Sequence, residues 1–377
     1  MDNSSCSTSS PQKDLLDAYY NHPDLSKIQT VLIVFFKHIG DVILSTPVYS
    51  VLKNRYPHLK IDALVNKETE EMLIGNPNIN RVISYDRAKV KSSFFNKIKG
   101  EVALYSSIRK LGYDMVISLD DSSRGRTLSW YSKAKINVGC GSRKKIIFGR
   151  VDPHTHWVRH TSVNRHYLQR HLDTLRRIGV YAKGDEIYPQ LFEGEKVKTK
   201  IAAVLQNAGI HNKPYILIHP TSRWMFKCWP AKSMGQLISR IQKEVKLPIV
   251  ITAAPDPTEA DYIKRMQKEI TAPVIDLTGQ LTLMELIPLV RAARLFIGVD
   301  SAPMHMASAT NTPTIALFGP SNETDWGPVG KKYYIVCAPQ HICRPCQLDG
   351  CGGGKICECL EDITVDKVFA KVQEELT

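Results

Sequence analysis

Several features that would assign this chain to a common class of protein are absent from its sequence. No apolar run of about 18 residues occurs, so we expect no transmembrane helix. The polar N-terminal stretch MDNSSCSTSSPQ lacks the apolar core of a signal peptide, so we expect a cytoplasmic protein with a disordered tail at residues 1–27 and reduced cysteines. Neither G-x-G-x-x-G after a strand nor G-x-x-x-x-G-K-[ST] occurs, which disfavours nicotinamide enzymes and P-loop ATPases.

Acidic residues are in the minority. The 377-residue chain has 50 Lys and Arg against 37 Asp and Glu, which gives a formal net charge of +13. Such a charge favours anionic partners, including phosphates, nucleic acid and acidic membrane surfaces. The sequence has no helix-turn-helix, RNP or finger signature, so we expect no nucleic-acid partner.

Short apolar runs alternate with segments of helical periodicity along the whole chain. The runs are TVLIVFF, KIDALV, RVISY and DMVISL in the first half, and YILIHP, PIVITAA, LFIGVD and PTIALFG in the second. Such runs suit strands buried on both faces of a parallel sheet, and their alternation with helical segments predicts an α/β protein. A polar stretch at 180–198 separates the two sets. We therefore predict an N-terminal domain at 28–185, a C-terminal domain at 186–377 that ends in a helix, and a ligand cleft between the two domains.

The stretch FFKHIGDVILSTP interrupts an apolar run with polar residues where the first predicted strand passes into a helix. This loop lies at the carboxyl end of a strand, where open α/β sheets bind ligands. Gly40 permits a tight turn and the close approach of another group. Asp41 is predicted either to be only a helix cap or to be a proton acceptor that faces the cleft. Lys37 and His38 are either solvated loop residues or ligand contacts.

The loop in YILIHPTSRWMFKCWP also follows a predicted strand. Thr221 and Ser222 offer hydroxyl groups and Lys227 offers a positive charge, a set that suits a phosphate group. A capped turn with a surface lysine is the alternative interpretation. Trp224 and Trp229 are predicted to be packing residues.

The stretch RLFIGVDSAPMHMASA is more specific. Its strand ends at Asp300, and the small residues Ser301 and Ala302 open a helix whose N-terminus is a ready anion site. His305 lies one turn into this helix and is either a core or capping residue or a ligand contact. Glu259 follows another strand end, so these loops are predicted to converge on one edge of the sheet.

Taken together, these motifs resemble glycosyltransferase family 9, the bacterial lipopolysaccharide heptosyltransferases. KHIGDVILSTP is similar to the family's N-terminal motif and GVDSAPMHMASATNTPTIALFGPSN to its nucleotide-site motif, while HPTSRWMFKCWP is most similar to the heptosyltransferase III branch. The resemblance covers roughly Thr30 to Leu360. It implies a GT-B fold, in which two Rossmann-like domains face a central cleft, with the acceptor bound by the first domain and the nucleotide sugar by the second.

The same resemblance implies an activity. The enzyme would transfer heptose from ADP-L-glycero-β-D-manno-heptose to a heptose of the lipid A–core acceptor, with inversion and without a bound metal ion or cofactor. Asp41 takes the position of the family's general base. The positions implied to bind the donor are Thr221, Ser222, Lys227, Glu259, Asp300, Ser301, Ala302 and His305, and the acceptor candidates are Lys37, His38, Arg124 and Arg143. The alternatives are heptosyltransferase I or II activity, or a non-catalytic protein of this fold that binds a sugar nucleotide or lipopolysaccharide.

Two basic stretches are predicted to meet the acceptor's phosphates or the membrane. Residues 133–170 hold nine Lys and Arg against one acidic residue, and residues 87–100 hold five with no acidic residue, with Phe94 and Phe95 among them. A solvated basic face is the alternative. Because the implied acceptor is lipid-linked, we expect transient peripheral contact with the cytoplasmic face of the anionic inner membrane.

A cysteine-rich segment, CRPCQLDGCGGGKICECL, lies near the C-terminus. A C-x-x-C pair followed by further cysteines can form a tetrahedral zinc site, but a second C-x-x-C is missing. Three interpretations stay open, namely a structural cluster of reduced thiols, a metal site and disulfides. The cysteines concerned are Cys343, Cys346, Cys351, Cys357 and Cys359.

Overall fold

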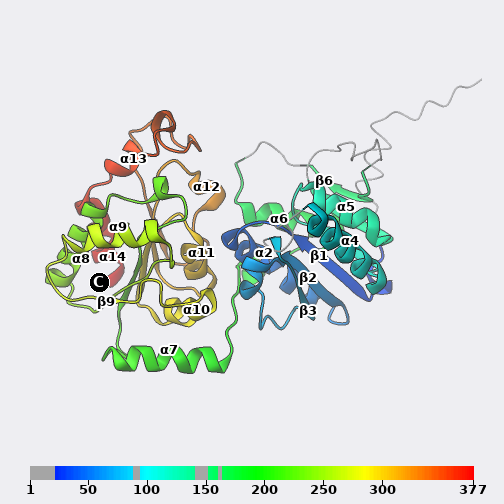
Figure 1. Cartoon of the computed structure of the whole chain (residues 1–377), viewed down its shortest axis with the longest axis horizontal. Coiled ribbons are helices and arrows are strands. Elements are labelled where there is room, and N and C mark those ends of the chain that lie inside the picture. The colour runs from blue at the N-terminus through cyan, green and yellow to red at the C-terminus, as the bar shows by residue number, and fades with distance from the viewer. Residues whose placement is uncertain (1–21, 88–93, 141–151, 160–163) are drawn as a thin grey trace, which may run out of the picture.

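The computed structural model describes residues 22–87, 94–140, 152–159 and 164–377. The chain forms two α/β units that lie side by side, one blue to green and the other green to red in Figure 1. Each is built on a six-stranded sheet, and all the strand pairs are parallel. The predicted α/β architecture is confirmed. The predicted boundary at 185/186 falls between the last strand of the first sheet and the first strand of the second.

The first unit contains six strands and the helices between them. Its strands are β1 (Thr30–Phe35), β2 (Lys60–Asn66), β3 (Arg81–Tyr85), β4 (Met115–Ser118), β5 (Ile136–Cys140) and β6 (His156–Val158). Its longer helices are α2 (Ile39–Arg55), α4 (Phe94–Leu111), α5 (Ser123–Ser132) and α6 (Tyr167–Arg176), and its short 3-10 turns include η1 (Leu25–Lys27), η2 (Lys67–Met72) and η4 (Gly184–Ile187).

The second unit repeats this plan. Its strands are β7 (Ile216–His219), β8 (Ile249–Ile251), β9 (Ile275–Asp276), β10 (Leu295–Val299), β11 (Thr314–Leu317) and β12 (Tyr333–Val336). Its helices are α7 (Glu195–Asn207), α8 (Ala231–Glu244), α9 (Pro257–Gln267), α10 (Leu283–Ala292), α11 (Ala302–Ala309), α12 (Glu323–Trp326), α13 (Glu358–Glu361) and α14 (Val365–Leu376), with short turns η5 (Met225–Lys227) and η6 (Cys351–Gly353).

Both sheets have the same strand order. The first runs β3-β2-β1-β4-β5-β6, and the second, read from its other edge, runs β9-β8-β7-β10-β11-β12. This is the Rossmann order, in which the chain direction across the sheet reverses between the first and the fourth strand. The reversal opens a crevice at the carboxyl ends of these two strands. In this protein the crevices lie after β1 and β4 in one unit and after β7 and β10 in the other.

Alternating residues of the central strands enter different cores, which is why the apolar runs are nearly continuous. In β1, Ile33 and Phe35 pack with α2 and α6, whereas Leu32 and Val34 pack with α4 and α5. In the second unit, one core lies under α8, α9 and α14. The other continues into the α2 and α6 core, so a single apolar core spans the two units.

The strand predictions agree closely with the structure. All eight predicted runs form strands, and the predicted C-terminal helix is α14. The strands that the apolar runs did not reveal are β5, β6, β9 and β12. Within the described residues, no helix combines the length and the apolar character that a bilayer span requires.

Candidate functional site

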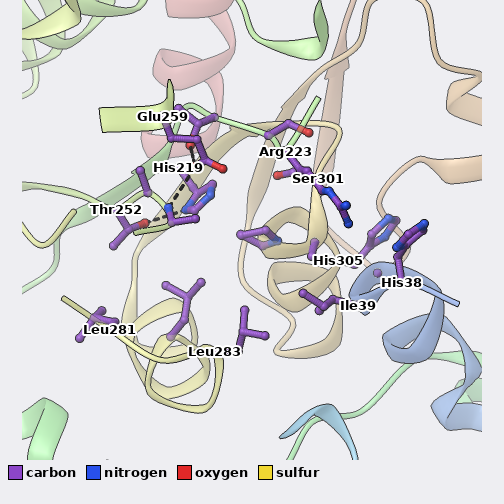
Figure 2. A pocket seen from close by; sticks show the side chains of 18 of the residues that line it. His38, Ile39, His219, Arg223, Thr252, Glu259, Leu281, Leu283, Ser301 and His305 are labelled. Atoms are coloured by element: carbon purple, nitrogen blue, oxygen red, sulfur yellow. Dashed lines mark hydrogen bonds between the residues drawn. The ribbon is translucent and has the colours of Figure 1, made fainter. Parts of the chain in front are cut away.

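A cavity of about 970 Å³ lies where the crevices of the two units face each other. Many of the residues that line it come from the loops after β1 and β2 in the first unit and after β7, β8, β9 and β10 in the second, and others come from α6, α7, α10 and α12. Figure 2 shows Glu259, His219 and Thr252 on one wall and His38 and Ile39 on the opposite wall. The cavity brings together most of the residues predicted from the motifs, namely Lys37, His38, Asp41, Thr221, Ser222, Lys227, Glu259, Asp300, Ser301, Ala302 and His305.

Asp41 is both a helix cap and a cavity residue. Its Oδ2 accepts a hydrogen bond of 3.0 Å from the backbone N–H of His38, the N-cap of α2, in a capping box. The carboxyl group is buried yet borders the cavity. Burial raises the pKa of Asp41, and the His38 N–H group and the nearby Lys37 and His38 oppose this only in part. A buried carboxylate with a raised pKa is a stronger base than a solvated one.

Lys227 and Asp300 pair with each other inside the cavity. The Lys227 Nζ atom donates a hydrogen bond of 2.6 Å to Asp300 Oδ2, and both side chains are largely buried. The loop after β7 and the loop after β10 are thereby joined at the crevice. An ammonium group held here, beside the start of α11 at Ser301, gives an anion two sources of positive charge.

Thr221 and Glu259 form a second pair on the same wall. The Thr221 hydroxyl donates to Glu259 Oε2 at 2.6 Å, and the backbone N–H of Ala254 donates to the same oxygen at 3.0 Å. These bonds fix the buried Glu259 carboxylate at the cavity edge. Its position suits contacts with hydroxyl groups of a ligand, since an ionised carboxylate can accept further hydrogen bonds.

His305 touches the other unit of the chain. A Cβ atom placed at Gly40 would lie 2.7 Å from His305 Cδ2, so the imidazole packs against the backbone at the start of α2. Burial lowers the pKa of His305 to about 4, so the ring is neutral at physiological pH. Its Nδ1 is buried and has no hydrogen-bond partner among the described residues. The close approach that Gly40 permits is therefore an approach by the second unit.

The sequence motifs did not predict His219 as a cavity residue. It ends β7, its Nδ1 lies 3.0 Å from the Thr252 hydroxyl, and burial lowers its pKa to about 4. Figure 2 shows this pair as a dashed contact on the wall that also carries Glu259. Its place at the carboxyl end of a central strand was a signal in the sequence.

The prediction for Trp224 was wrong, whereas that for Trp229 is confirmed. Trp229 is fully buried and donates to the carbonyl oxygen of Ile363. Trp224 is 43% exposed and lines the cavity. Its ring meets the His38 ring edge to face at 5.6 Å, and the Lys227 ammonium lies 4.9 Å from its centroid. The polar loop holds the Trp224 indole away from the core. The prediction failed because the local sequence pattern gives no reason to treat Trp224 and Trp229 differently.

Contacts between the two units close the cavity at its edges. Tyr167 of α6 stacks on Trp326 of α12 at 4.2 Å, and both rings line the cavity. Beside them, Arg170 pairs with Asp325 at 3.2 Å. At another edge, Glu71 Oε2 accepts a hydrogen bond of 2.8 Å from the backbone N–H of Met284 in α10. These residues were missed because their partners are distant in sequence.

The acceptor candidate Arg124 is not among the described residues that line the cavity. Arg124 pairs with Glu101 at 2.7 Å, and its guanidinium lies 4.4 Å from the Tyr85 ring centroid. Arg143 lies outside the described residues. A role of either in acceptor binding stays a prediction.

The cysteine-rich segment lies apart from the cavity lining. Cys357 and Cys359 are buried in the core under α8 and α14, which supports the interpretation as packed thiols. The described cysteines are free thiols. In the part of the chain that the structure describes, no three His, Cys, Asp or Glu side chains form a group that could hold a metal ion.

Two doubly wound domains that share one ligand cavity between their crevices define the GT-B class of glycosyltransferases, and this chain has that fold. A family model described as glycosyltransferase family 9 (heptosyltransferase) matches residues 102–356. Lipopolysaccharide heptosyltransferase 3 of Escherichia coli K12 is 31% identical over 297 residues, 78% of this chain and 83% of its own length. The chain belongs to glycosyltransferase family 9, and it is an enzyme of the heptosyltransferase type.

Solved structures agree with this assignment at the level of the fold. A glycosyltransferase family 9 protein from Veillonella parvula superimposes with a TM-score of 0.78 at 23% identity, covering 92% of this chain and 97% of its own. The E. coli heptosyltransferase WaaC with ADP superimposes with a TM-score of 0.67 at 20% identity, covering 92% of this chain and all of its own.

Proposed function

We propose that the enzyme transfers L-glycero-D-manno-heptose from ADP-heptose to a heptose of the lipopolysaccharide inner core, as heptosyltransferase III does. The identity of 31% to a protein named lipopolysaccharide heptosyltransferase 3 supports the subtype. The observation that carries the proposal is the cavity itself. It has a buried carboxylate on the wall of the first domain and a lysine, hydroxyl groups and a helix N-terminus on the wall of the second.

In the proposed reaction, Asp41 is the general base. It takes the proton of the acceptor hydroxyl while the hydroxyl oxygen attacks the anomeric carbon from the face opposite the leaving group. The new glycosidic bond forms as the bond between the anomeric carbon and the phosphate oxygen breaks, so the anomeric configuration inverts. A positioned base of this kind contributes about 10²–10⁴-fold to the rate. The burial that raises the pKa of Asp41 supports this role.

The departing ADP takes the bonding electrons and gains negative charge. We propose that Lys227, the hydroxyl groups of Thr221 and Ser222, and the N-terminus of α11 stabilise that charge without a bound metal ion. Both the lysine and the hydroxyl groups line the cavity. The structure of WaaC with ADP, a protein of similar fold, supports a nucleotide as a ligand of this fold. Glu259 would then contact the donor's hydroxyl groups.

The acceptor is proposed to enter from the side of the first domain. Lys37 and His38 line the cavity beside Asp41, where they can meet a phosphorylated sugar. Because such an acceptor is lipid-linked, we propose that the enzyme works at the cytoplasmic face of the inner membrane.

Defined acceptors test this proposal directly. The purified protein is incubated with ADP-heptose and with core oligosaccharides that end before the first heptose, after the first and after the second. The expected product gains one heptose, only on the acceptor that already carries two, with inverted anomeric configuration by NMR and an unchanged rate in excess EDTA. Transfer to either shorter acceptor would instead indicate heptosyltransferase I or II activity, and donor binding without transfer to any acceptor would contradict the proposed reaction.

A further inference from the structure

An apolar surface with aromatic rings lies on α4 and α5, outside the residues that line the cavity. Five large apolar side chains are exposed on these helices. Leu111 ends α4, and the other four are Ile98 at 47%, Val102 at 59%, Trp130 at 38% and Tyr131 at 38%. We call these four residues the α4–α5 face. In Figure 1 both helices lie on the side of the first domain that points away from the second domain. Water-exposed patches of this kind mark interaction sites more often than single exposed residues do.

Ring contacts make this face continuous across the two helices. Ile98 and Val102 are one helical turn apart in α4, and Tyr105 follows on the same side. The Tyr105 ring stacks on Tyr131 of α5 at 5.1 Å, and Tyr131 meets Trp130 edge to face at 4.6 Å. The rings are held in place by each other, so presenting them costs little conformational entropy on docking.

Basic side chains predominate among the exposed charges of α4, of α5 and of the residues that follow α5. In the described parts of the segments 94–111 and 123–136, the exposed charged side chains are all basic: Lys99, Arg109, Lys110, Lys133 and Lys135. The single carboxylate of these segments, Glu101, is only partly exposed and is neutralised by Arg124 at 2.7 Å. A flat apolar patch with a cationic rim is complementary to a surface that is anionic outside and apolar beneath.

We propose that the α4–α5 face docks on an anionic lipid bilayer. Trp and Tyr favour the boundary between water and acyl chains, because their rings are apolar and carry one polar group. Each Lys or Arg near an anionic leaflet adds a favourable and salt-sensitive contribution. A second copy of this chain fits less well, because its own basic rim would meet this one.

The two helices that carry the face begin at the sheet edge that borders the cavity. Both α4 and α5 begin at the carboxyl edge of the first sheet, the edge from which the Asp41 loop also leaves. Arg124, in the first turn of α5, joins the two regions, since it pairs with Glu101 of α4 and lies 5.3 Å from the Phe36 ring centroid. Docking on lipid does not depend on the proposed function. Only its biological role, access to a lipid-linked acceptor, rests on that function.

Vesicle binding by the full-length protein tests the proposal. The protein is sedimented with phosphatidylcholine vesicles and with vesicles that contain one quarter phosphatidylglycerol, at low and at high salt. We expect binding to the anionic vesicles, weaker at high salt, and at least about tenfold weaker for the double variant Lys99→Glu/Lys133→Glu. Trp130→Ala should weaken binding as well, with little change in its salt dependence.

Matched controls test whether the loss of any two lysines, or of any exposed apolar residue, weakens vesicle binding as much as changes in this face do. Lys264→Glu/Lys268→Glu reverses two exposed lysines at the C-terminal end of α9, and Ile342→Ser removes a fully exposed apolar residue just before the cysteine-rich segment. These controls should bind anionic vesicles as the unchanged protein does. Equal losses in the controls and in the α4–α5 variants would overturn the proposal. A concentration-dependent dimer in light scattering that Trp130→Ala abolishes would also overturn it, in favour of a second copy.

The failure of this proposal differs from a failure of the proposed function. If the face docks on lipid, the Lys99→Glu/Lys133→Glu variant slows transfer to a lipid-linked acceptor in vesicles and leaves transfer to a delipidated core oligosaccharide unchanged. Equal slowing with both acceptors overturns the docking role. If neither acceptor is a substrate for the unchanged protein, the proposed function fails, and the vesicle measurement still decides the docking surface by itself.

Discussion

The Lys227 ammonium and the Asp300 carboxylate lie 2.6 Å apart and bridge the two central loops of the second domain. A diphosphate that enters the cavity must share this lysine with Asp300 or take it over. Both groups are shielded from solvent. Binding of a diphosphate would therefore replace the charge-assisted hydrogen bond from Lys227 to Asp300 by one from Lys227 to a phosphate oxygen. The pair keeps the lysine ordered at the crevice before any nucleotide binds.

Removing the lysine should weaken nucleotide binding. Lys227→Ala is expected to raise the ADP dissociation constant at least about tenfold and to slow transfer, because one hydrogen bond to a charged group is lost. Titration calorimetry with ADP measures the first effect. Lys232→Ala, an exposed lysine nearby that is not a cavity residue, is the matched control. An ADP affinity and a rate both equal to those of the control would reject this role.

Substitutions at Asp41 separate its two roles. Asp41→Asn should lower kcat by at least about 10²-fold, because the base is lost. It should keep the helix cap, since the amide oxygen can still accept the His38 N–H bond. Asp41→Ala should lower kcat as much and also cost about 1 kcal/mol of stability, because the cap is lost as well. Near-normal kcat in a folded Asp41→Asn protein, measured at saturating donor, would exclude Asp41 as the base.

The raised pKa of Asp41 predicts a pH dependence of the rate. The base acts only when ionised, so transfer should fall with decreasing pH through a pKa above the ordinary value of 3.8. The Asp41→Asn variant should lack this acid limb in its residual activity. A rate profile of unchanged protein that stays flat down to the ordinary carboxyl range would contradict the raised pKa.

The raised pKa of Asp41 also predicts that the stability of the fold depends on pH. A carboxyl group whose pKa is raised by folding binds its proton more tightly in the folded state, so its ionisation destabilises the fold as pH rises through the folded pKa. Asp41→Asn should therefore be more stable than the unchanged protein at neutral pH, and the difference should shrink in acid. Urea unfolding of both proteins measures this. His219 and His305 do not disturb the comparison, because both proteins contain them.

Gly40→Ala tests the contact between the domains. Alanine favours a helix over glycine by about 0.5–1 kcal/mol, so the substitution should help α2 by itself. Its methyl group would lie 2.7 Å from His305 Cδ2, so either the His305 ring or the start of α2 must shift, and a shift of α2 would move the two domains relative to each other. We expect kcat/KM to fall at least about tenfold, because the base shifts relative to the donor.

Gly194→Ala is the control for this experiment, since no atom lies within 4 Å of a Cβ placed there. Scattering in solution should show a larger radius of gyration for Gly40→Ala alone. Unchanged transfer together with an unchanged radius would show that the contact is not needed for the site.

Much of the fold could be predicted because its central strands are buried on both faces. β1, β7 and β10 read as apolar runs, since nearly every residue enters one of two cores. Shorter or more polar strands gave no such run. β9 has two residues, and β5 contains Asn137, whose side chain bonds to the carbonyl oxygen of Ala134. These strands form because the neighbouring strand is already in place, which is information that a local window lacks.

Some residues of the candidate site could likewise be predicted from the sequence, and others could not. Asp41, Thr221 and Asp300 were predictable, because each follows a central strand and the topology brings strand ends together. The stack of Tyr167 on Trp326 was not, because it joins residues of different domains. Such contacts depend on how the two domains meet, and no spacing rule encodes that.

The stack of Tyr167 on Trp326 has a consequence for turnover. Both rings belong to the contact between the domains and also line the cavity. A ligand that contacts these rings therefore couples its binding to the contact between the domains. A substitution that strengthens this contact should also strengthen ligand binding. If release of the nucleotide requires the rings to separate, a stronger stack would slow release and a weaker one would loosen binding, so turnover would be fastest at an intermediate strength.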